Sequence, residues 1–240
     1  MNLKALITFL LVLTLGGANM RFVTGRQDGN LYVSYKVDVS KTDLRLYWKN
    51  DKNQQFNSIA NLKSWVESKN KKLVFAMNGG MYMENRSPLG LYIENTKQWR
   101  RLNTARGGGN FYLQPNGVFY ITTDNKPGIC KTREFVNNGK IKYATQSGPL
   151  LVVNGAINPI FTKGSANTNI RNGVGILPTG EVVFAMSKSD VSFYDFAKYF
   201  HDQGCKYALY LDGFVSRTYL PEKNWTQTDG DFGVIIGVTK

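Results

Sequence analysis

The stretch KLVFAMNGG, residues 72 to 80, places an apolar run directly before an asparagine and two glycines. The run Lys72 to Met77 predicts a buried strand. Gly79 and Gly80 predict either a tight turn with positive φ or a backbone whose N–H groups bind an anion. Asn78 adds a side-chain amide, which can bind phosphate or sugar hydroxyls. This end of the strand is therefore the first candidate site.

The segments that precede this strand predict two more strands and a helix. Leu31 to Val39 alternates apolar and polar residues, and Leu44 to Trp48 follows after a short polar turn, so we expect the two to form a hairpin. Gln55 to Asn70 carries apolar residues at helical spacing, which predicts an amphipathic helix packed on the sheet.

The segments that follow are mostly strands separated by glycine-rich turns. Ser192 to Gln203 predicts a second helix, with Ser192 as its N-cap and Gly204 as its stop. The other predicted strands are Gly90 to Ile93, Phe111 to Leu113, Val118 to Thr122, Pro149 to Val153, Gly173 to Leu177, Val182 to Met186, Tyr207 to Leu211 and Phe232 to Val238. Because strands and hairpins outnumber helices, the sequence predicts an α+β fold, with a largely antiparallel or mixed β-sheet and two main helices in a single domain.

The composition restricts the chemistry. The 240 residues include 30 Lys and Arg against 17 Asp and Glu, a formal charge of +13, with one His and two Cys. One His and two Cys cannot supply a four-ligand Cys/His zinc site. Chemistry must therefore rest on carboxylates, Arg, Asn, hydroxyls or backbone groups.

The first residues have the layout of an export signal, with Lys4 before an apolar run and small residues at Gly16 to Ala18. We expect a signal peptide over residues 1–18 and a domain over 19–240, in an exported protein that is periplasmic or secreted. An uncleaved anchor is the alternative. No later apolar run approaches the ~20 residues of a spanning helix, so we expect no membrane span in the mature chain. Cys130 and Cys205 form either one disulfide or two buried thiols.

The excess positive charge suits an anionic partner such as a phosphorylated glycan, an acidic envelope polymer, a membrane surface or nucleic acid. The basic residues are scattered along the chain, which favours an ordinary solvated surface, and we expect no nucleic-acid partner. A glycine-rich segment from Arg106 to Asn110 offers either a cradle for an anion or a plain loop. It lacks the lysine and the strand-to-helix context of a nucleotide site, so it is interpreted as a loop.

Three more polar segments lie beside predicted strands. Asp212-Gly213, with Ser216 beyond it, offers a carboxylate as a base or a hydroxyl ligand, or forms an ordinary turn. Arg171-Asn172 offers a guanidinium at a sheet edge, where it can grip a phosphate, or a plain surface arginine. Ser147-Gly148 offers a hydroxyl donor or a turn cap.

In this order, the segments resemble the phosphodiester glycosidase family. The resemblance rests on MNGGMY (77–82), QSGPLLVVNG (146–155), IRNGVGI (170–176), FYDFAKYF (193–200) and YLDGFVS (210–216). It implies a hydrolase that cleaves a sugar from a phosphodiester-linked glycan. The family's last motif has further glycines after the aspartate, whereas this chain has Phe214 and Val215.

The resemblance also implies roles for residues in one shared pocket. Arg171, with N–H groups near Gly79 and Gly80, would hold the phosphate, while Asp212 would act on water or bind sugar hydroxyls. The implied catalytic residues are Asp212 and Arg171, and the implied substrate-binding residues are Asn78, Gly79, Gly80, Ser147, Gly148, Asn172, Gly213 and Ser216. Glu84 is a further candidate carboxylate.

Other interpretations of the same residues stay open at this point. The pocket of a non-catalytic envelope protein could bind a phosphorylated glycan or another polyanion without cleaving it. The bond cut could be P–O and not C–O. No cofactor is certain, and a divalent cation at Asp212 is an alternative that one carboxylate leaves open.

Overall fold

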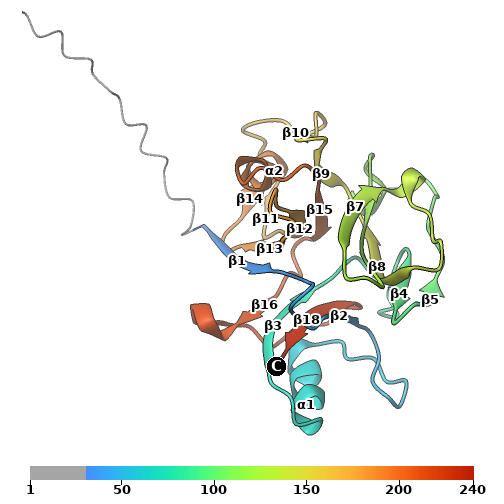
Figure 1. Cartoon of the computed structure of the whole chain (residues 1–240). Coiled ribbons are helices and arrows are strands. Elements are labelled where there is room, and N and C mark those ends of the chain that lie inside the picture. The colour runs from blue at the N-terminus through green and yellow to red at the C-terminus, as the bar shows by residue number, and fades with distance from the viewer. Residues whose placement is uncertain (1–30) are drawn as a thin grey trace, which may run out of the picture.

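The computed structural model describes residues 31–240, so the predicted signal peptide lies outside the described residues. Three antiparallel sheets meet around a shared core (Figure 1). The first has six strands in the order β1-β13-β12-β15-β9-β10. Their bounds are β1 (Tyr32–Val37), β13 (Val182–Ser187), β12 (Asn172–Ile176), β15 (Ala208–Asp212), β9 (Leu150–Val153) and β10 (Ala156–Ile157).

The second and third sheets have five strands each. The second is β17 (Trp225–Thr226), β16 (Thr218–Leu220), β3 (Leu73–Asn78), β18 (Ile235–Thr239) and β2 (Leu44–Tyr47), in that order. The third is β5 (Lys97–Arg100), β4 (Tyr92–Glu94), β8 (Ile141–Ser147), β6 (Gly117–Thr122) and β7 (Pro127–Lys131). A short pair, β11 (Thr168–Asn169) with β14 (Val191–Ser192), lies outside them.

Two α-helices cover outer faces of the described fold (Figure 1). The helix α1 (Ile59–Ser68) buries Ile59, Leu62 and Val66 in a cluster that includes residues of the second sheet. The helix α2 (Phe193–Asp202) packs on the first sheet near β9 and β10. Its N-cap is Ser192, whose Oγ accepts from the N–H of Asp195 at 3.1 Å, as predicted.

One aromatic side chain joins all three sheets. Phe184 of β13 is fully buried, with its ring centroid 5.4 Å from that of Phe75 on β3 and 5.8 Å from that of Phe119 on β6. These three residues belong to one hydrophobic cluster that draws on every sheet. Burying such rings against one another supplies much of the free energy that holds the sheets together.

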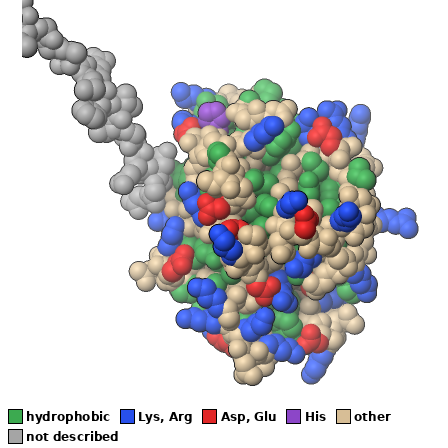
Figure 2. Space-filling view, viewed as in Figure 1, with side chains coloured by type: hydrophobic (Ala, Val, Ile, Leu, Met, Phe, Trp, Pro, Cys, Tyr) green, Lys and Arg blue, Asp and Glu red, His purple; other side chains and the backbone are tan. Residues whose placement is uncertain are grey.

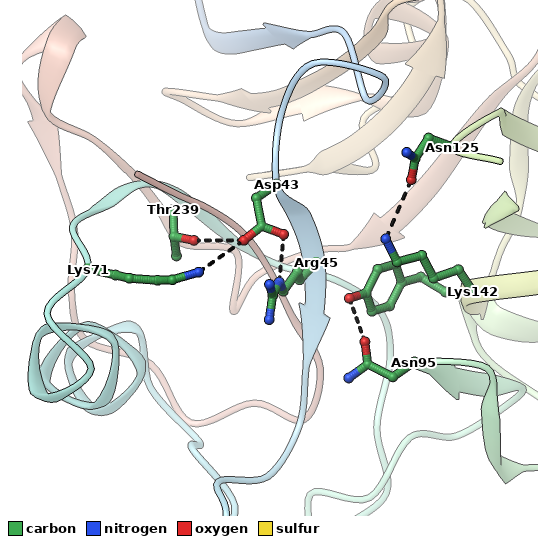
Figure 3. A network of polar contacts seen from close by, with 8 residues as sticks. Asp43, Arg45, Lys71, Asn95, Asn125, Lys142 and Thr239 are labelled. Carbon is green, nitrogen blue, oxygen red and sulfur yellow. Dashed lines mark hydrogen bonds and ion pairs between the residues drawn. The ribbon is translucent and has the colours of Figure 1, made fainter. Parts of the chain in front are cut away.

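A polar network lies at the periphery of the second sheet (Figure 3). The Asp43 carboxylate accepts from Arg45 Nε at 2.6 Å, from Lys71 Nζ at 3.4 Å and from Thr239 Oγ1 at 3.3 Å. These contacts join the start of β2 to the end of β18 and to the segment after α1. On the neighbouring third sheet, the Tyr143 hydroxyl donates to Asn95 Oδ1 at 2.8 Å.

The fold class is confirmed, and every strand pairing described is antiparallel. The strands β12 and β13 form a hairpin around Pro178-Thr179-Gly180, and the turn Asn154-Gly155 joins β9 to β10. Among the described helices, none has the length and apolar character required to cross a bilayer.

Two strand predictions are wrong. Leu31 to Val39 and Leu44 to Trp48 do not form a hairpin, because β1 pairs with β13 in the first sheet and β2 pairs with β18 in the second. The apolar faces of both strands reach the same core from different sheets. Phe111 to Leu113 is not a strand either: Asn110–Tyr112 form a 3-10 turn, and Asn116 Nδ2 donates to the Phe111 carbonyl at 3.0 Å.

Candidate active site

The Asn78 side chain, at the end of β3, connects the second sheet to the first. Its Oδ1 accepts from Asn172 Nδ2 at 2.9 Å and from the backbone N–H of Arg217 at 2.9 Å. Because two donors face Oδ1, the amide nitrogen must point the other way, and it donates to Asp212 Oδ2 at 3.1 Å. The orientation of Asn78 therefore fixes a donor against the carboxyl of Asp212.

The Asp212 carboxyl lies at the end of β15 and is 9% exposed. Its second oxygen, Oδ1, accepts from the backbone N–H of Gly213 at 2.8 Å. Burial raises the pKa of Asp212 to about 7, although the hydrogen bonds from Gly213 and Asn78 act in the opposite direction. This carboxyl can therefore give or take a proton near neutral pH.

Asp212 lines a hollow of about 310 Å³ on the surface. The lining residues are Met81, Tyr82, Leu89, Gly108, Gly109, Asn110, Phe111, Tyr112, Asp212 and Val215. Asp212 is the one carboxylate among these residues, and its charge contributes to a raised pKa of Tyr82, after the larger effect of burial. The volume is at the lower end of the ~300 to 1,000 Å³ range of small-molecule sites.

The end of β8 is joined to the same place. Ser147 is fully buried, and its Oγ donates to the Leu211 carbonyl at 2.8 Å, directly before Asp212. Thr145 Oγ1 donates to the Gly79 carbonyl at 2.9 Å. All three sheets thus contribute a strand end to the site: β3, β8 and the pair of β12 with β15.

Several predicted binding residues have structural partners here. The Gly79 N–H donates to the Val234 carbonyl at 2.8 Å, so this amide is not free to hold a phosphate. A Cβ on Gly80 would lie 2.8 Å from Thr145 Oγ1, and one on Gly148 would lie 2.6 Å from Asn116 Cβ. These glycines therefore permit close packing of the segments beneath the hollow.

The turn after Asp212 is closed by Ser216. The backbone N–H and the Oγ of Ser216 both donate to the Gly213 carbonyl, at 2.7 and 2.5 Å. A Cβ on Gly213 would lie 2.4 Å from the Tyr210 hydroxyl, so a larger residue there would displace that hydroxyl. Phe214, one of the two residues that depart from the family motif, is 82% exposed.

Arg171 lies beneath the site and does not line the hollow. Its side chain is fully buried, and its guanidinium donates to the carbonyls of Val191 (Nε, 2.9 Å) and Asn167 (Nη2, 3.0 Å). Its Cζ lies 3.6 Å above the Phe193 ring. The expected position at an open sheet edge is therefore wrong, because the aromatic ring and the carbonyls cover the charge.

Tyr210 connects Arg171 to the site. Arg171 Nη1 donates to the Tyr210 hydroxyl at 3.4 Å, on the side of that ring which meets Gly213. Burial lowers the pKa of Arg171, and the structure gives its guanidinium no ion pair within residues 31–240. The Tyr210 hydroxyl therefore lies between the Arg171 guanidinium and the turn at Gly213.

The other predicted chemical groups are placed as follows. Glu84 is exposed and does not line the hollow. Cys130 and Cys205 are free thiols, and burial raises the pKa of each to about 11. No three His, Cys, Asp or Glu residues gather into a metal site in the described part of the chain. Both oxygens of Asp212 face N–H donors, an arrangement that does not favour a hard cation there.

Sequence reasoning gave no role of their own to Tyr82 and Tyr210, although both lie in the quoted motifs. It interpreted the glycine-rich segment 106–110 as a loop, whereas Gly108 to Tyr112 form a wall of the hollow. Tyr210 was hidden inside an apolar strand, where nothing distinguishes it from core. The glycines at 107–109 were the available signal for the wall, because a run of glycines beside a site lets the backbone approach a ligand closely.

The raised pKa of Asp212 predicts a pH-dependent stability. The folded state holds this proton more tightly than the unfolded chain, in which the pKa is about 4. The stabilisation is complete at low pH and is lost as the pH rises through about 7. Relative to Asp212→Asn, the wild-type free energy of unfolding should fall by about 3 kcal/mol between pH 5 and pH 8, measured by urea unfolding. A difference that is constant with pH would contradict this assignment.

The chain is similar in sequence to a known protein family and to a relative from Escherichia coli. The phosphodiester glycosidase family matches residues 71–238. The uncharacterized protein YigE of Escherichia coli (strain K12) is 40% identical over 188 residues, which cover 78% of this chain and 73% of YigE.

Solved structures share the fold at low sequence identity. The zebrafish N-acetylglucosamine-1-phosphodiester alpha-N-acetylglucosaminidase catalytic domain, auto-inhibited by its pro-peptide, matches with a TM-score of 0.54 and 13% identity over 87% of this chain and 88% of that one. A putative exported protein from Burkholderia pseudomallei matches with a TM-score of 0.55 and 10% identity over 86% and 73%. The family match covers most of the sequence and includes all the segments that meet at Asp212, and this chain therefore belongs to the phosphodiester glycosidase family.

Proposed function

We propose that this protein is an exported hydrolase that cleaves a sugar from a phosphodiester-linked glycan at the hollow lined by Asp212. Family membership supports the reaction class. The observation that carries the assignment of the site is the buried Asp212 carboxyl, with a pKa of about 7, in the lining of that hollow. Export, to the periplasm or outside the cell, is supported by the apolar N-terminal sequence.

One carboxyl is sufficient for this chemistry. Ordinary glycosidases use two carboxylates because a sugar alkoxide leaves poorly and must be protonated. Cleavage at the anomeric carbon of a sugar phosphodiester expels a phosphate monoester, which leaves readily without a strong acid. Asp212 in its ionised form can orient and deprotonate a water molecule, and Asn78 and Gly213 hold the carboxyl in place.

The leaving phosphate needs positive charge and hydrogen-bond donors. Gly108 and Gly109 line the hollow and have no side chains. A Cβ at either position would meet nothing within 4 Å, so the space beside this backbone is open. Their backbone is therefore open to a close approach by an anion. Arg171 adds a buried positive charge. Its hydrogen bond polarises the Tyr210 hydroxyl, which lies beside the Gly213 turn.

Replacing the carboxyl tests its role in turnover. Asp212→Asn should lower kcat on the glycerol diester of a sugar 1-phosphate by a factor of about 10² to 10⁴, because the amide cannot take a proton. Free sugar release measures turnover, and Glu84→Gln is the matched control that should keep full activity. Hydrolysis in oxygen-18 water should place the label on the sugar; label on the phosphate would show P–O cleavage instead. Binding of the diester without any product would support a non-catalytic protein.

Replacing the buried cation tests its proposed electrostatic role. Arg171→Ala should lower kcat by about a hundredfold, which corresponds to about 3 kcal/mol of barrier. Since this variant also leaves a cavity, Tyr210→Phe is the second variant: it keeps the ring and Arg171 but removes the hydroxyl between them. Tyr210→Phe should lower kcat about tenfold with little change in KM. Wild-type kcat in both folded variants would exclude Arg171 from the mechanism.

A further inference from the structure

A strongly basic segment without acidic residues lies beside the site. Asn95 to Thr123 contains Lys97, Arg100, Arg101 and Arg106 and neither Asp nor Glu. Within residues 31–240, none of these four cations forms an ion pair. Lys and Arg side chains also lie at many other places on the surface, and Figure 2 shows one face of it.

Part of this segment forms a groove next to the hollow of Asp212. The groove has a volume of about 560 Å³ and shares Leu89 with that hollow. Its lining residues are Leu89, Trp99, Arg100, Arg101, Leu102, Asn103, Thr104 and Ala105. Beyond it, Gly108 and Gly109 of the same segment form a wall of the hollow itself. One stretch of chain therefore runs from the groove to the site.

Gln146 holds this stretch in place. Its Oε1 accepts from the Asn103 N–H at 2.9 Å, and its Nε2 donates to the Asn103 carbonyl at 2.7 Å. Asn103 Nδ2 in turn donates to the Leu89 carbonyl at 3.2 Å. Gln146 is 1% exposed and directly precedes Ser147, so the groove is built on the same strand end as the site.

The groove combines cations with an aromatic ring. Trp99 is 37% exposed, with Lys97 Nζ 3.7 Å from its ring centroid and the Trp48 ring edge-on at 6.1 Å. Arg100 Nη2 donates to Met83 Sδ at 3.2 Å, and no carboxylate within residues 31–240 forms an ion pair with Arg100. Guanidinium groups bind phosphate oxygens through paired hydrogen bonds, and an indole ring offers an apolar face to a sugar.

We propose that this groove binds a second phosphate-bearing unit of the substrate, so that the substrate is a glycan polymer with repeated phosphodiesters. The inference rests on the proposed function for the identity of the bond cut at Asp212. A single-stranded nucleic acid fits less well, because stacking of successive bases requires several aromatic rings and Trp99 is the one aromatic residue lining the groove.

Binding of inorganic anions tests the groove without any turnover. Tripolyphosphate should bind the wild-type protein at least ten times more tightly than orthophosphate in titration calorimetry, and the double variant Arg100→Gln/Arg101→Gln should lose at least tenfold in tripolyphosphate affinity. Arg133→Gln/Lys140→Gln removes the same charge from exposed positions outside the groove and should change affinity less than twofold. Equal losses in the two double variants would overturn the proposal, and so would tighter binding of a single-stranded oligonucleotide than of tripolyphosphate.

Turnover of two matched substrates then tests the substrate class. The substrates are the glycerol diester of a sugar 1-phosphate and the same diester with a second phosphate on the glycerol. The wild-type protein should show a KM about tenfold lower for the second compound, and Arg100→Gln/Arg101→Gln should abolish that preference. Arg133→Gln/Lys140→Gln should keep both the preference and the wild-type kcat. No preference in the wild type would overturn the proposal. If neither compound is cleaved while the anion-binding result holds, the proposed hydrolysis fails and the groove stands.

Discussion

The site depends on the fixed orientation of one buried amide. Asn78 Oδ1 accepts from both Asn172 Nδ2 and the Arg217 N–H, so the nitrogen of the same amide has to face Asp212. Reversing it would place donors against donors in a buried setting, where an unmade hydrogen bond costs about 1 to 3 kcal/mol. The position of the Asp212 carboxyl, and with it the shape of the hollow, follows from this constraint.

The fold supplies the strand ends that the site requires. Phe184 brings the three sheets together through Phe75 and Phe119, and the open ends of β3, β8 and β15 then meet on one side. This arrangement costs stability, because the Asp212 carboxyl is buried without a cationic contact. Such a group shifts its pKa upward and stays neutral at mild acidity. This cost to stability is also what makes the group useful as a base near neutral pH.

Much of the fold was predictable because its signals are local. Ser192 and Gly204 indicate the ends of α2, and Asn154-Gly155 indicates the turn between β9 and β10. Which strands pair was not predictable for β1 and β2, since their partners come more than a hundred residues later in the chain. The strand β8 was missed entirely. Its last residues, Thr145 to Ser147, are polar, and only the structure shows that they are buried because they connect the site.

The site residues also divide into those with a local sequence signal and those whose placement depends on distant contacts. Asn78 and Asp212 could be predicted, because each follows an apolar strand and precedes glycine. Their contact could not, because 134 positions separate them in the chain. Arg171 was expected to be accessible, and its burial depends on Phe193, which is contributed by a helix that follows in the sequence. Charge and glycine content marked the segment at 106–110, but its place in the wall of the hollow depends on Gln146, which fixes Asn103 earlier in that stretch.

The central claim is that Asp212 is a buried carboxyl poised near neutral pH. A carbon-13 NMR titration of the aspartate carboxyl carbons, with Asp212 assigned by its absence in Asp212→Asn, measures this directly. Burial of this carboxyl predicts a resonance that titrates with a pKa of about 7. A pKa near the ordinary aspartate value of about 4 would contradict it.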